Sequence, residues 1–346
     1  MKKVMHLMST HDFSGAENVA CQIINAFKED YRYEMLYVSE IDGNKGSLID
    51  REIKYYRLDK FNYFNVKKSI QKFKPDIIHA HDAKAIILAS FFSNTAKIVA
   101  HIHGNHENMR CLTSKTILLN IVSKKISKFI WVSKSSLNDY YYSKKIKKKS
   151  LILYNVIDSN DLYNKIKLDN NEYENDIVFL GRMSYPKNPL RLIKIISEVI
   201  KVNPKTKVAL IGSGEYDNEV KNLIVLQGLT QNIKLYGFVQ NPYKILNQSK
   251  IMIMTSRYEG TPMCALEAIA CGLPIITTIT DGLSEIIIDG ETGFLSNEDN
   301  ILIDKINYLL ENESELKEMR KKVKKHNETI NNIEKYKCII NEVYSE

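Results

Sequence analysis

Cysteine is scarce and scattered in this chain. Its 346 residues include five cysteines, Cys21, Cys111, Cys264, Cys271 and Cys338. No two of them have the close spacing of a metal-ligand pair. An odd number without a dense framework argues against a disulfide-stapled secreted scaffold and fits a reducing cytosol.

Long apolar runs are missing as well. No segment approaches the ~20 apolar residues that a membrane-spanning helix needs. The N-terminal apolar run ends at Ser9, where polar residues begin, so it predicts a first buried strand rather than a signal peptide. We expect a cytoplasmic protein that contacts a membrane at most peripherally.

Neither sign of charge is in large excess. Lys and Arg number 49 against 41 Asp and Glu, a net charge of +8, which does not indicate a nucleic-acid partner. The densest basic run is Lys144–Lys149. Such a run most often forms a solvated loop or helix end. The alternative is a foot on an anionic membrane surface, helped by the neighbouring Tyr140, Tyr141 and Tyr142.

The dominant pattern is an alternation of short apolar runs with longer amphipathic stretches, which is typical of parallel strands joined by helices. The first half predicts helices at 16–27 and 115–127 and strands at 4–9, 34–39, 53–58, 76–81, 97–103, 129–133 and 151–155. The second half predicts a charged helical tail at 300–346 and strands at 177–181, 208–212, 233–238, 251–256, 274–278 and 285–288.

The alternation stops and restarts once, which predicts an α/β protein with two Rossmann-like, doubly wound domains. We place the first domain at residues 1–160, a polar linker at 161–175, the second domain at 176–325 and a final helix at 326–346. In open α/β sheets, ligands bind beyond the carboxyl ends of the strands. Each motif described below lies at such a predicted strand end.

The most informative stretch runs from Tyr258 to Ala268, after an apolar strand and into a helix. Pro262 suits the first helical position, since its missing N–H would be unpaired there anyway. The helix N-terminus can bind a phosphate, while Glu259 and Glu267 on either side can accept hydrogen bonds from hydroxyl groups. These features describe a nucleotide-sugar site. The simpler alternative is a helix N-terminus with ordinary acidic neighbours.

Together with the Cys271-Gly272-Leu273-Pro274 segment that follows, this stretch resembles the signature of the retaining glycosyltransferases of family four, the group 1 type. That family has two Glu residues separated by seven others, with Gly-x-Pro between them, as Glu259 and Glu267 are here. The resemblance implies the GT-B fold, with two Rossmann-like domains facing across a cleft and the last helix packing back on the first domain. The first domain would bind the acceptor and the second the nucleotide sugar.

The resemblance also implies individual roles around the helix entry. Glu267 would hold the ribose hydroxyls. The sugar would be held by Glu259, in a catalytic role, and by the backbone of Gly260 and Thr261. The backbone N–H groups of Met263 and Cys264 would bind the diphosphate.

A second motif, Gly181–Asn188, follows the first strand of the second domain. Arg182 offers a planar fork that can grip phosphate oxygens in bidentate fashion, and Lys187 adds a point charge. Two fixed cations would stabilise the charge that develops on a departing diphosphate. The string matches the family's Gly-Arg…Lys-Asn pattern, in which both cations bind the diphosphate. The family's nucleotide base packs near the turn at Tyr236–Val239, which points to Phe238.

Two motifs of the first domain complete the candidate site. Gly15, between the first strand and first helix, permits close approach of the backbone to a ligand, although Ser14 stands where the family usually has a first Gly. His103 lies at the tip of a strand, with His101 on the same face. By resemblance, a His at this strand end contacts the donor sugar, so we assign His103 a catalytic role, with His101 as the fallback.

The histidines also raise the possibility of zinc, because His79 and His81 end the preceding strand and His106 follows. No Cys joins them, and the His pairs share strand faces across a packed sheet, so we expect no metal site. The chain has no Asp-x-Asp motif either, which argues against the Mg²⁺-bridged diphosphate of the other glycosyltransferase fold. We expect no cofactor apart from the nucleotide sugar as substrate.

The function implied is a metal-independent retaining hexosyl- or N-acetylhexosaminyl-transferase. Its donor would be a nucleotide sugar, with UDP favoured over GDP. Its acceptor would be a polysaccharide or lipid-linked saccharide of a bacterial surface glycan, such as a capsule or exopolysaccharide. Two alternatives remain open: a sugar-nucleotide epimerase of the same architecture, and a non-catalytic nucleotide-sugar-binding subunit.

Overall fold

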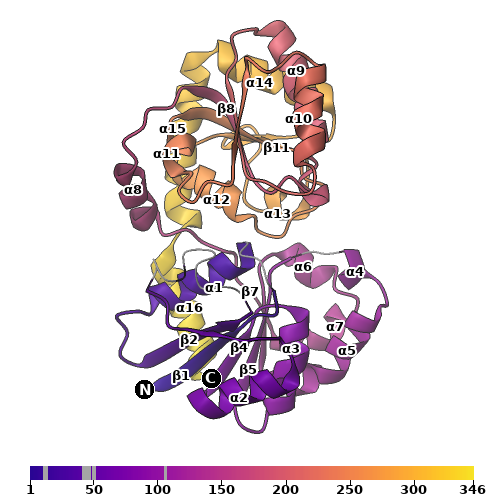
Figure 1. Cartoon of the computed structure of the whole chain (residues 1–346), viewed down its shortest axis with the longest axis vertical. Helices are drawn as coiled ribbons and strands as arrows, with labels where there is room; N and C mark the ends of the chain where they lie inside the picture. Colours follow the sequence, from indigo (N-terminus) through magenta and orange to yellow (C-terminus); the bar gives the residue numbers. More distant parts are fainter. Residues whose placement is uncertain (11–14, 41–47, 49–51, 105–106) are drawn as a thin grey trace. The chain divides into compact units, whose positions relative to one another are not determined.

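The computed structural model of this chain describes residues 1–10, 15–40, 48, 52–104 and 107–346. The chain divides into two compact units, each with its own parallel sheet: Met1–Asn155 with Ile333–Glu346, and Val156–Asn332. Figure 1 shows the elements of each unit. The prediction of two doubly wound α/β domains is therefore confirmed for each unit taken by itself.

In the first unit, the described residues form a seven-stranded sheet in the order β3-β2-β1-β4-β5-β6-β7. Every neighbouring pair is parallel, and in the centre His6 of β1 lies opposite His79 of β4. The strands are β1 (Lys2–Leu7), β2 (Tyr33–Ser39), β3 (Tyr55–Arg57), β4 (Ile77–Ala80), β5 (Lys97–Ile102), β6 (Lys128–Trp131) and β7 (Ser150–Ile152).

Helices cover both faces of this sheet, as a parallel sheet requires (Figure 1). One face packs Met5, Ile78 and Ile98 into a core shared with α2, α3 and α5. The helical segments are α1 (Gly15–Ala26), α2 (Tyr63–Phe73), α3 (Ala83–Ala89), η2 (Ser90–Phe92), α4 (Glu107–Arg110), α5 (Ser114–Val122), η3 (Ser123–Lys125), α6 (Lys134–Asn138), α7 (Ser143–Ile146), η4 (Lys147–Lys149) and α16 (Ile333–Ser345).

The last helix, α16, belongs to the first unit although it ends the chain. The Nζ of Lys2 donates to the carbonyl oxygen of Tyr344 at 2.9 Å, and the hydroxyl of Tyr33 donates to Oδ1 of Asn341 at 2.8 Å. Tyr344 is buried against the sheet, where its hydroxyl lies 2.7 Å from Nδ1 of His79. The helix thus covers the face of the sheet that carries the histidines.

The second unit has a six-stranded parallel sheet in the order β10-β9-β8-β11-β12-β13. Its strands are β8 (Asn175–Leu180), β9 (Val208–Ile211), β10 (Ile233–Gly237), β11 (Ser249–Met254), β12 (Ile275–Thr277) and β13 (Gly293–Leu295). Its helices are α8 (Ser159–Leu168), η5 (Tyr185–Lys187), α9 (Pro189–Val202), α10 (Asp217–Leu226), α11 (Tyr243–Asn247), α12 (Met263–Ala270), α13 (Asp281–Ser284), α14 (Asp299–Glu311) and α15 (Glu313–Ile330).

The structure differs from the sequence prediction at the segment expected to be a linker. Asp158 caps a helix there, because its Oδ1 accepts from the backbone N–H groups of Asn160 and Asp161, and α8 then runs to Leu168. Leu162 of α8 is buried. The polar composition that suggested a linker is the solvent face of a packed helix.

The expected boundaries of the second domain also differ from those of the unit. The second unit continues to Asn332, beyond the expected residue 325, because α15 is unbroken to Ile330. Asn331 fixes the end of α15 to the second unit. Its Oδ1 accepts from the N–H of Ile157 at 2.8 Å, and its Nδ2 donates to the carbonyl oxygen of Leu266 at 3.2 Å.

The strand predicted at 285–288 is wrong. The backbone N–H groups of Ile286 and Ile287 both donate to the carbonyl oxygen of Leu283, so this apolar run is a turn that continues α13. The sixth strand is β13, which pairs with β12. Ile286 and Ile287 are buried as the pattern required, but in a turn rather than a ladder.

Candidate functional site

The strand order of the second sheet reverses between β8 and β11, and ligands of open α/β sheets bind at the carboxyl edge beside such a reversal. The loop after β8 carries Gly181–Asn188, and the loop after β11 leads into α12. Hydrogen bonds join the two loops. Thr255 donates through Oγ1 to the carbonyl oxygens of Lys187 and Asn188, at 3.2 and 3.0 Å. The N–H of Arg257 donates to the carbonyl oxygen of Pro186 at 2.7 Å.

Lys187 and Glu259, predicted from separate motifs, form an ion pair at this edge. The Nζ of Lys187 lies 2.6 Å from Oε1 of Glu259, and the two side chains are only 16% and 11% exposed. Ser256 donates to the same carboxylate oxygen at 2.7 Å. Burial by itself disfavours the charge on Lys187, but the Cys264 sulfur and the Glu259 carboxylate raise its pKa above the ordinary range. A fixed cation therefore stands at the predicted phosphate site.

The entry to α12 has free backbone donors. Pro262 is the residue before the helix rather than its first residue, with Met263 as the first. The N–H of Ala265 donates to the Pro262 carbonyl at 3.1 Å, whereas the N–H groups of Met263 and Cys264 have no acceptor among the described residues. Burial raises the pKa of the Cys264 thiol to about 11, so this thiol is neutral at pH 7. The first turn can therefore receive an anion on two N–H groups.

Glu267 lies one turn further along α12 and is 8% exposed. The hydroxyl of Tyr243 lies 3.3 Å from its Oε1. Gly260 and Thr261 are buried in the loop before the helix, and Gly282 of α13 packs directly on the backbone of Glu259 and Gly260. A Cβ added to Gly282 would lie 1.2 Å from the carbonyl oxygen of Gly260. The loop that carries Glu259 is therefore held in place by α13.

Arg182 and Phe238, also predicted to bind the donor, lie in loops after β8 and β10 and make no contact with the ion pair. Arg182 is exposed, and its guanidinium has no hydrogen-bonded or ionic partner among the described residues. Phe238 is 74% exposed. The structure brings together Lys187, Glu259 and the entry to α12, while these two side chains project from nearby loops.

Three contributing residues were not singled out from the sequence. Ser256 ends the predicted strand 251–256, so a hydroxyl at a strand end was an available signal. Tyr243 has no motif around it and is identified only by its contact with Glu267. Gly282 lies in α13, and its close approach to Gly260 depends on the fold and cannot be read from one sequence.

In the first unit, Gly15 is exposed and is the first residue of α1, while the neighbouring Ser14 lies outside the described residues. The adjacent edge of the sheet is organised by Asp82. Its carboxylate accepts from the N–H and the hydroxyl of Ser9, at 2.7 and 2.8 Å, and from the N–H of Ala85 at 2.9 Å. The carboxyl ends of β1 and β4 are thereby joined beside the strand-order reversal of this sheet.

His103 belongs to a cluster of five histidines on one face of β1, β4 and β5, of which His103 is partly buried and the other four are buried. Nε2 of His103 lies 2.9 Å from Nδ1 of His81, and Nε2 of His81 lies 2.9 Å from Nδ1 of His6. A second chain joins the Tyr344 hydroxyl to His79 and His79 to His101, at 2.7 and 3.2 Å. Three ring nitrogens have no partner among the described residues: Nε2 of His6, Nε2 of His101 and Nδ1 of His103.

Burial keeps these imidazoles neutral. It lowers the pKa of His6 and of His103 to about 3, and the pKa of His79, His81 and His101 is also lowered, by burial and then by neighbouring histidines. Ring nitrogens of His6, His79 and His81 lie within 4.8 Å of one another, as do those of His81, His101 and His103. The strand faces thus gather more potential ligand atoms than the sequence predicted. However, hydrogen bonds already use both nitrogens of His79 and His81, and a bound metal would have to break them.

Comparison with known proteins agrees with this geometry. The family described as "Glycosyl transferase 4-like" matches residues 5–133, and "Glycosyl transferases group 1" matches residues 163–326. The capsular polysaccharide biosynthesis glycosyltransferase CapH of Staphylococcus aureus is 26% identical over 287 residues, spanning 78% of this chain and 79% of CapH.

Two further comparisons span more of the chain. A Campylobacter jejuni α-1,4-N-acetyl-D-galactosaminyltransferase, named for a diphospho-undecaprenol-linked acceptor, is 25% identical over 338 residues and 92% of each chain. The crystal structure of Anabaena HepE with UDP and glucose has a TM-score of 0.88, 20% identity and full coverage of both chains.

The order of the two units, their sheets and the motifs at the strand ends define a glycosyltransferase of the GT-B fold. More narrowly, the chain belongs to the family-four glycosyltransferases. Among its described residues, no helix has the length and apolar character needed to cross a bilayer.

Proposed function

We propose that this glycosyltransferase transfers a hexosyl or N-acetylhexosaminyl group from a UDP-sugar to a polysaccharide or lipid-linked saccharide in bacterial surface-glycan synthesis. The observation that carries the donor site is the Lys187–Glu259 pair beside the free N–H groups of α12. The names of CapH and of the Campylobacter enzyme support the acceptor class. UDP in the HepE crystal structure supports the choice of base.

Each part of the donor has a partner in this proposal. The diphosphate is held by Lys187, Arg182 and the N–H groups of Met263 and Cys264. The sugar is held by Glu259 with the backbone of Gly260 and Thr261. The ribose is held by Glu267, which is buried one turn inside α12 and can accept two hydroxyl hydrogen bonds, while Phe238 supplies an apolar surface for the base.

The reaction proposed is a front-face displacement that retains the anomeric configuration. The bond between the anomeric carbon and the diphosphate oxygen breaks, and the acceptor hydroxyl oxygen bonds to that carbon from the same face. The departing phosphate accepts the hydroxyl proton. Lys187 and Arg182 stabilise the charge that develops on the diphosphate. A glycosidase would instead need one carboxylic acid and one carboxylate flanking the bond, a role that the ion-paired Glu259 does not suit.

His103 is proposed as the catalytic contact to the donor sugar from the first unit, by resemblance to the family. Its pKa of about 3 means that it acts as a neutral imidazole at pH 7. Its Nδ1 is buried and has no hydrogen-bond partner among the described residues. We also propose that no metal is required, because Lys187, Arg182 and the α12 N-terminus supply the positive charge that a Mg²⁺ ion would otherwise bring.

Thermal shift with a panel of nucleoside diphosphates and their sugars tests the donor site. A ligand at a hundredfold excess over its dissociation constant should stabilise the protein by about 2.7 kcal/mol, or a few degrees. The shift should be confined to uridine nucleotides and be lost in Glu267→Ala and Arg182→Ala. Lys205→Ala is the matched control, because it removes one exposed cation before β9, at the opposite edge of the sheet.

The reaction itself is tested with a lipid-linked saccharide acceptor and excess EDTA. An α-linked product from an α-linked donor, formed at an unchanged rate in EDTA, would support the retaining, metal-independent reaction. A free epimerised sugar nucleotide formed without acceptor would indicate the epimerase instead. Well-folded protein that shifts with no nucleotide would contradict the donor assignment, whereas a nucleotide shift without transfer to any acceptor would favour the non-catalytic subunit. We propose a cytoplasmic location with peripheral membrane contact, which brings the enzyme to such an acceptor.

A further inference from the structure

The positive charge of the chain is concentrated in one part of the first unit. Residues 108–157 contain eleven Lys and Arg but a single acidic residue, Asp139. All the other residues together have 38 Lys and Arg against 40 Asp and Glu. Asp139 is itself paired, since its Oδ2 lies 3.1 Å from the guanidinium of Arg110. From outside the segment, Glu346 pairs with Lys128 at 2.9 Å. The positive surface of the segment therefore comes from its other lysines.

The same segment exposes large aliphatic side chains. On α5, Thr116 and Leu119 are buried against the unit. One turn of the helix presents Ile117, Leu118 and Ile121 to solvent, and these are 39%, 45% and 62% exposed. This places an apolar stripe on the outer face of a surface helix, where a polar face is expected.

The apolar stripe and the basic run adjoin one another. The Nζ of Lys149 donates to the carbonyl oxygens of Ile126, Lys124 and Ser123, at 2.8, 3.3 and 3.4 Å, so η4 is fixed to the end of the α5–η3 segment. Four lysines of the run remain exposed: Lys144, Lys145, Lys147 and Lys148. On the other side, the Nζ of Lys125 lies 5.8 Å from the ring centre of Phe91, which is 63% exposed.

This arrangement modifies the membrane foot expected from the sequence. Tyr140 cannot contribute to it, because the side chain is 3% exposed and packs on Trp131. Tyr141 is 50% exposed at the base of the basic run. The apolar part of the surface comes instead from Ile117, Leu118 and Ile121 of α5.

We propose that α5, η3 and the α7–η4 segment form a docking surface for a bilayer leaflet rich in anionic phospholipid. Lysines near such a leaflet are attracted to its negative potential, and aliphatic side chains of an interfacial helix enter the boundary between headgroups and acyl chains. This docking surface rests on the proposed function, because a lipid-linked acceptor is presented at a membrane. It identifies the part of the chain that would contact that membrane. Protein-binding surfaces are typically richer in Trp, Tyr and Arg.

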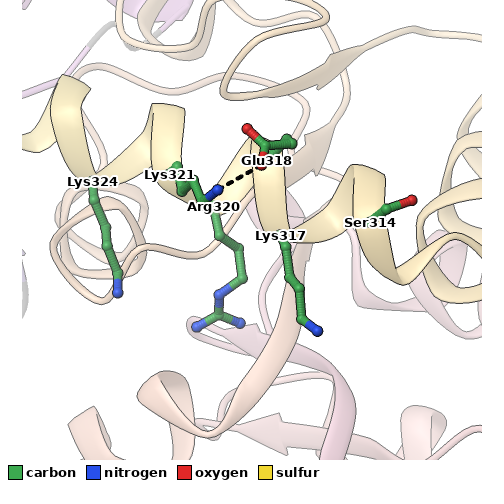
Figure 2. A pocket seen from close by; sticks show the side chains of 6 residues that line it. All are labelled: Ser314, Lys317, Glu318, Arg320, Lys321 and Lys324. Carbon is green, nitrogen blue, oxygen red and sulfur yellow. Dashed lines mark hydrogen bonds and ion pairs between the residues drawn. The ribbon is translucent and has the colours of Figure 1, made fainter.

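The chain offers a second basic surface for comparison. A groove of about 470 Å³ runs along α15, lined by Ser314, Lys317, Glu318, Arg320, Lys321 and Lys324 (Figure 2). Acidic neighbours balance it: Lys321 pairs with Glu318 at 2.6 Å, and Lys317 pairs with Glu313 at 2.7 Å. No large hydrophobic side chain of α15 is exposed. This helix therefore provides a control in which the same number of exposed lysines can be changed without an apolar component nearby.

The test is co-sedimentation of the full chain with vesicles of phosphatidylcholine alone or with about one third phosphatidylglycerol, at physiological salt. We expect binding only to the anionic vesicles. Changing Lys144, Lys145, Lys147 and Lys148 to Gln should weaken partitioning by about fivefold per lysine. Leu118→Gln with Ile121→Gln should weaken it by about tenfold or more per side chain.

The matched control changes four exposed lysines of α15, Lys317, Lys321, Lys322 and Lys325, to Gln, and it should bind like the wild type. Equal loss in this control, or no binding of the wild type to anionic vesicles, would overturn the proposal and indicate that the α5 face binds a protein partner.

Nucleotide thermal shifts, measured on the same variants, distinguish failure of the docking surface from failure of the donor site. Retained shifts with lost vesicle binding support the docking surface, whereas vesicle binding without any nucleotide shift would overturn the proposed function alone.

Discussion

At the scale of single residues, the Lys187 ammonium interacts with two anions. It contacts Glu259 at 2.6 Å, and the diphosphate is proposed to bind beside it. The pair is mostly buried, so each charge depends on the other for compensation. Such a pair keeps the cation charged and oriented before the donor arrives. It also makes both residues important for folding as well as for binding, and the two contributions have to be separated by experiment.

We expect Lys187→Met to destabilise the second unit by about 2–4 kcal/mol, because it leaves a mostly buried carboxylate without its cation. The double variant Lys187→Met with Glu259→Gln should recover much of that loss, since the uncompensated charge is gone. Urea unfolding of the wild type, both single variants and the double variant measures the coupling. All variants carrying Lys187→Met should lose the nucleotide shift. Purely additive single effects would show that the pair is not coupled.

At the scale of elements, the site depends on backbone segments that approach without side chains between them. Gly282 of α13 abuts the carbonyl of Gly260, and Gly212 after β9 abuts that of Gly181, where an added Cβ would lie 2.0 Å from the oxygen. These contacts set the loops that carry Glu259 and Arg182. The positions of the loops therefore depend on neighbouring elements as well as on the hydrogen bonds between the loops.

Gly282→Ala should displace the Glu259–Gly260 loop, because the new Cβ would collide with backbone that cannot move alone. We expect about 1–3 kcal/mol of destabilisation together with weakened nucleotide binding in thermal shift. Gly290→Ala is the control: its φ of 73° makes Ala strained, but no atom lies within 4 Å of the new Cβ. That variant should lose about 1–2 kcal/mol and keep nucleotide affinity. Unchanged affinity in Gly282→Ala would show that α13 does not position the loop.

The same scale shows what could be predicted from the sequence. Strand ends marked by motifs were located well, because a buried parallel strand is a continuous apolar run and its exit carries the polar residues. The run at 285–288 was misassigned because periodicity cannot distinguish a buried turn from a strand. Helix α8 was missed because its polar face dominates its composition and only Leu162 is buried. The Lys187–Glu259 pair joins two predicted motifs, but the loop geometry that brings them together is set by distant contacts.

The contacts among the five histidines could not be predicted from the sequence. Alternation placed His101 and His103 on one face, yet the hydrogen-bonded chains through His81 to His6 depend on the register of β1 against β4. That register comes from the packing of the whole sheet. The hydrogen-bonded cluster of neutral imidazoles therefore exists only in the folded first unit.

At the scale of the whole molecule, the two units should differ in their response to acid. The pKa values of His6, His79, His81, His101 and His103 are lowered in the folded first unit, to about 3 for His6 and His103. The unfolded chain binds these protons as the pH falls through ~6.5, whereas the folded unit does not. Their contribution to stability is therefore fully present above pH ~6.5 and is lost below it. Each site can contribute a slope of about 1.4 kcal/mol per pH unit.

We expect the first unit to unfold in mild acid while the second persists. Trp131 is the chain's single tryptophan and is buried in β6, so its fluorescence follows the first unit alone. Its urea midpoint should fall steeply between pH 7 and pH 5, whereas uridine-nucleotide binding, a property of the second unit, should outlast it. A His6→Leu variant should show a shallower pH slope by about 1.4 kcal/mol per unit. His326→Asn, outside the cluster, should leave the slope unchanged. A tryptophan midpoint constant from pH 7 to pH 5 would mean that the buried histidines do not control the stability of the unit, because their protonation would then cost the folded state nothing.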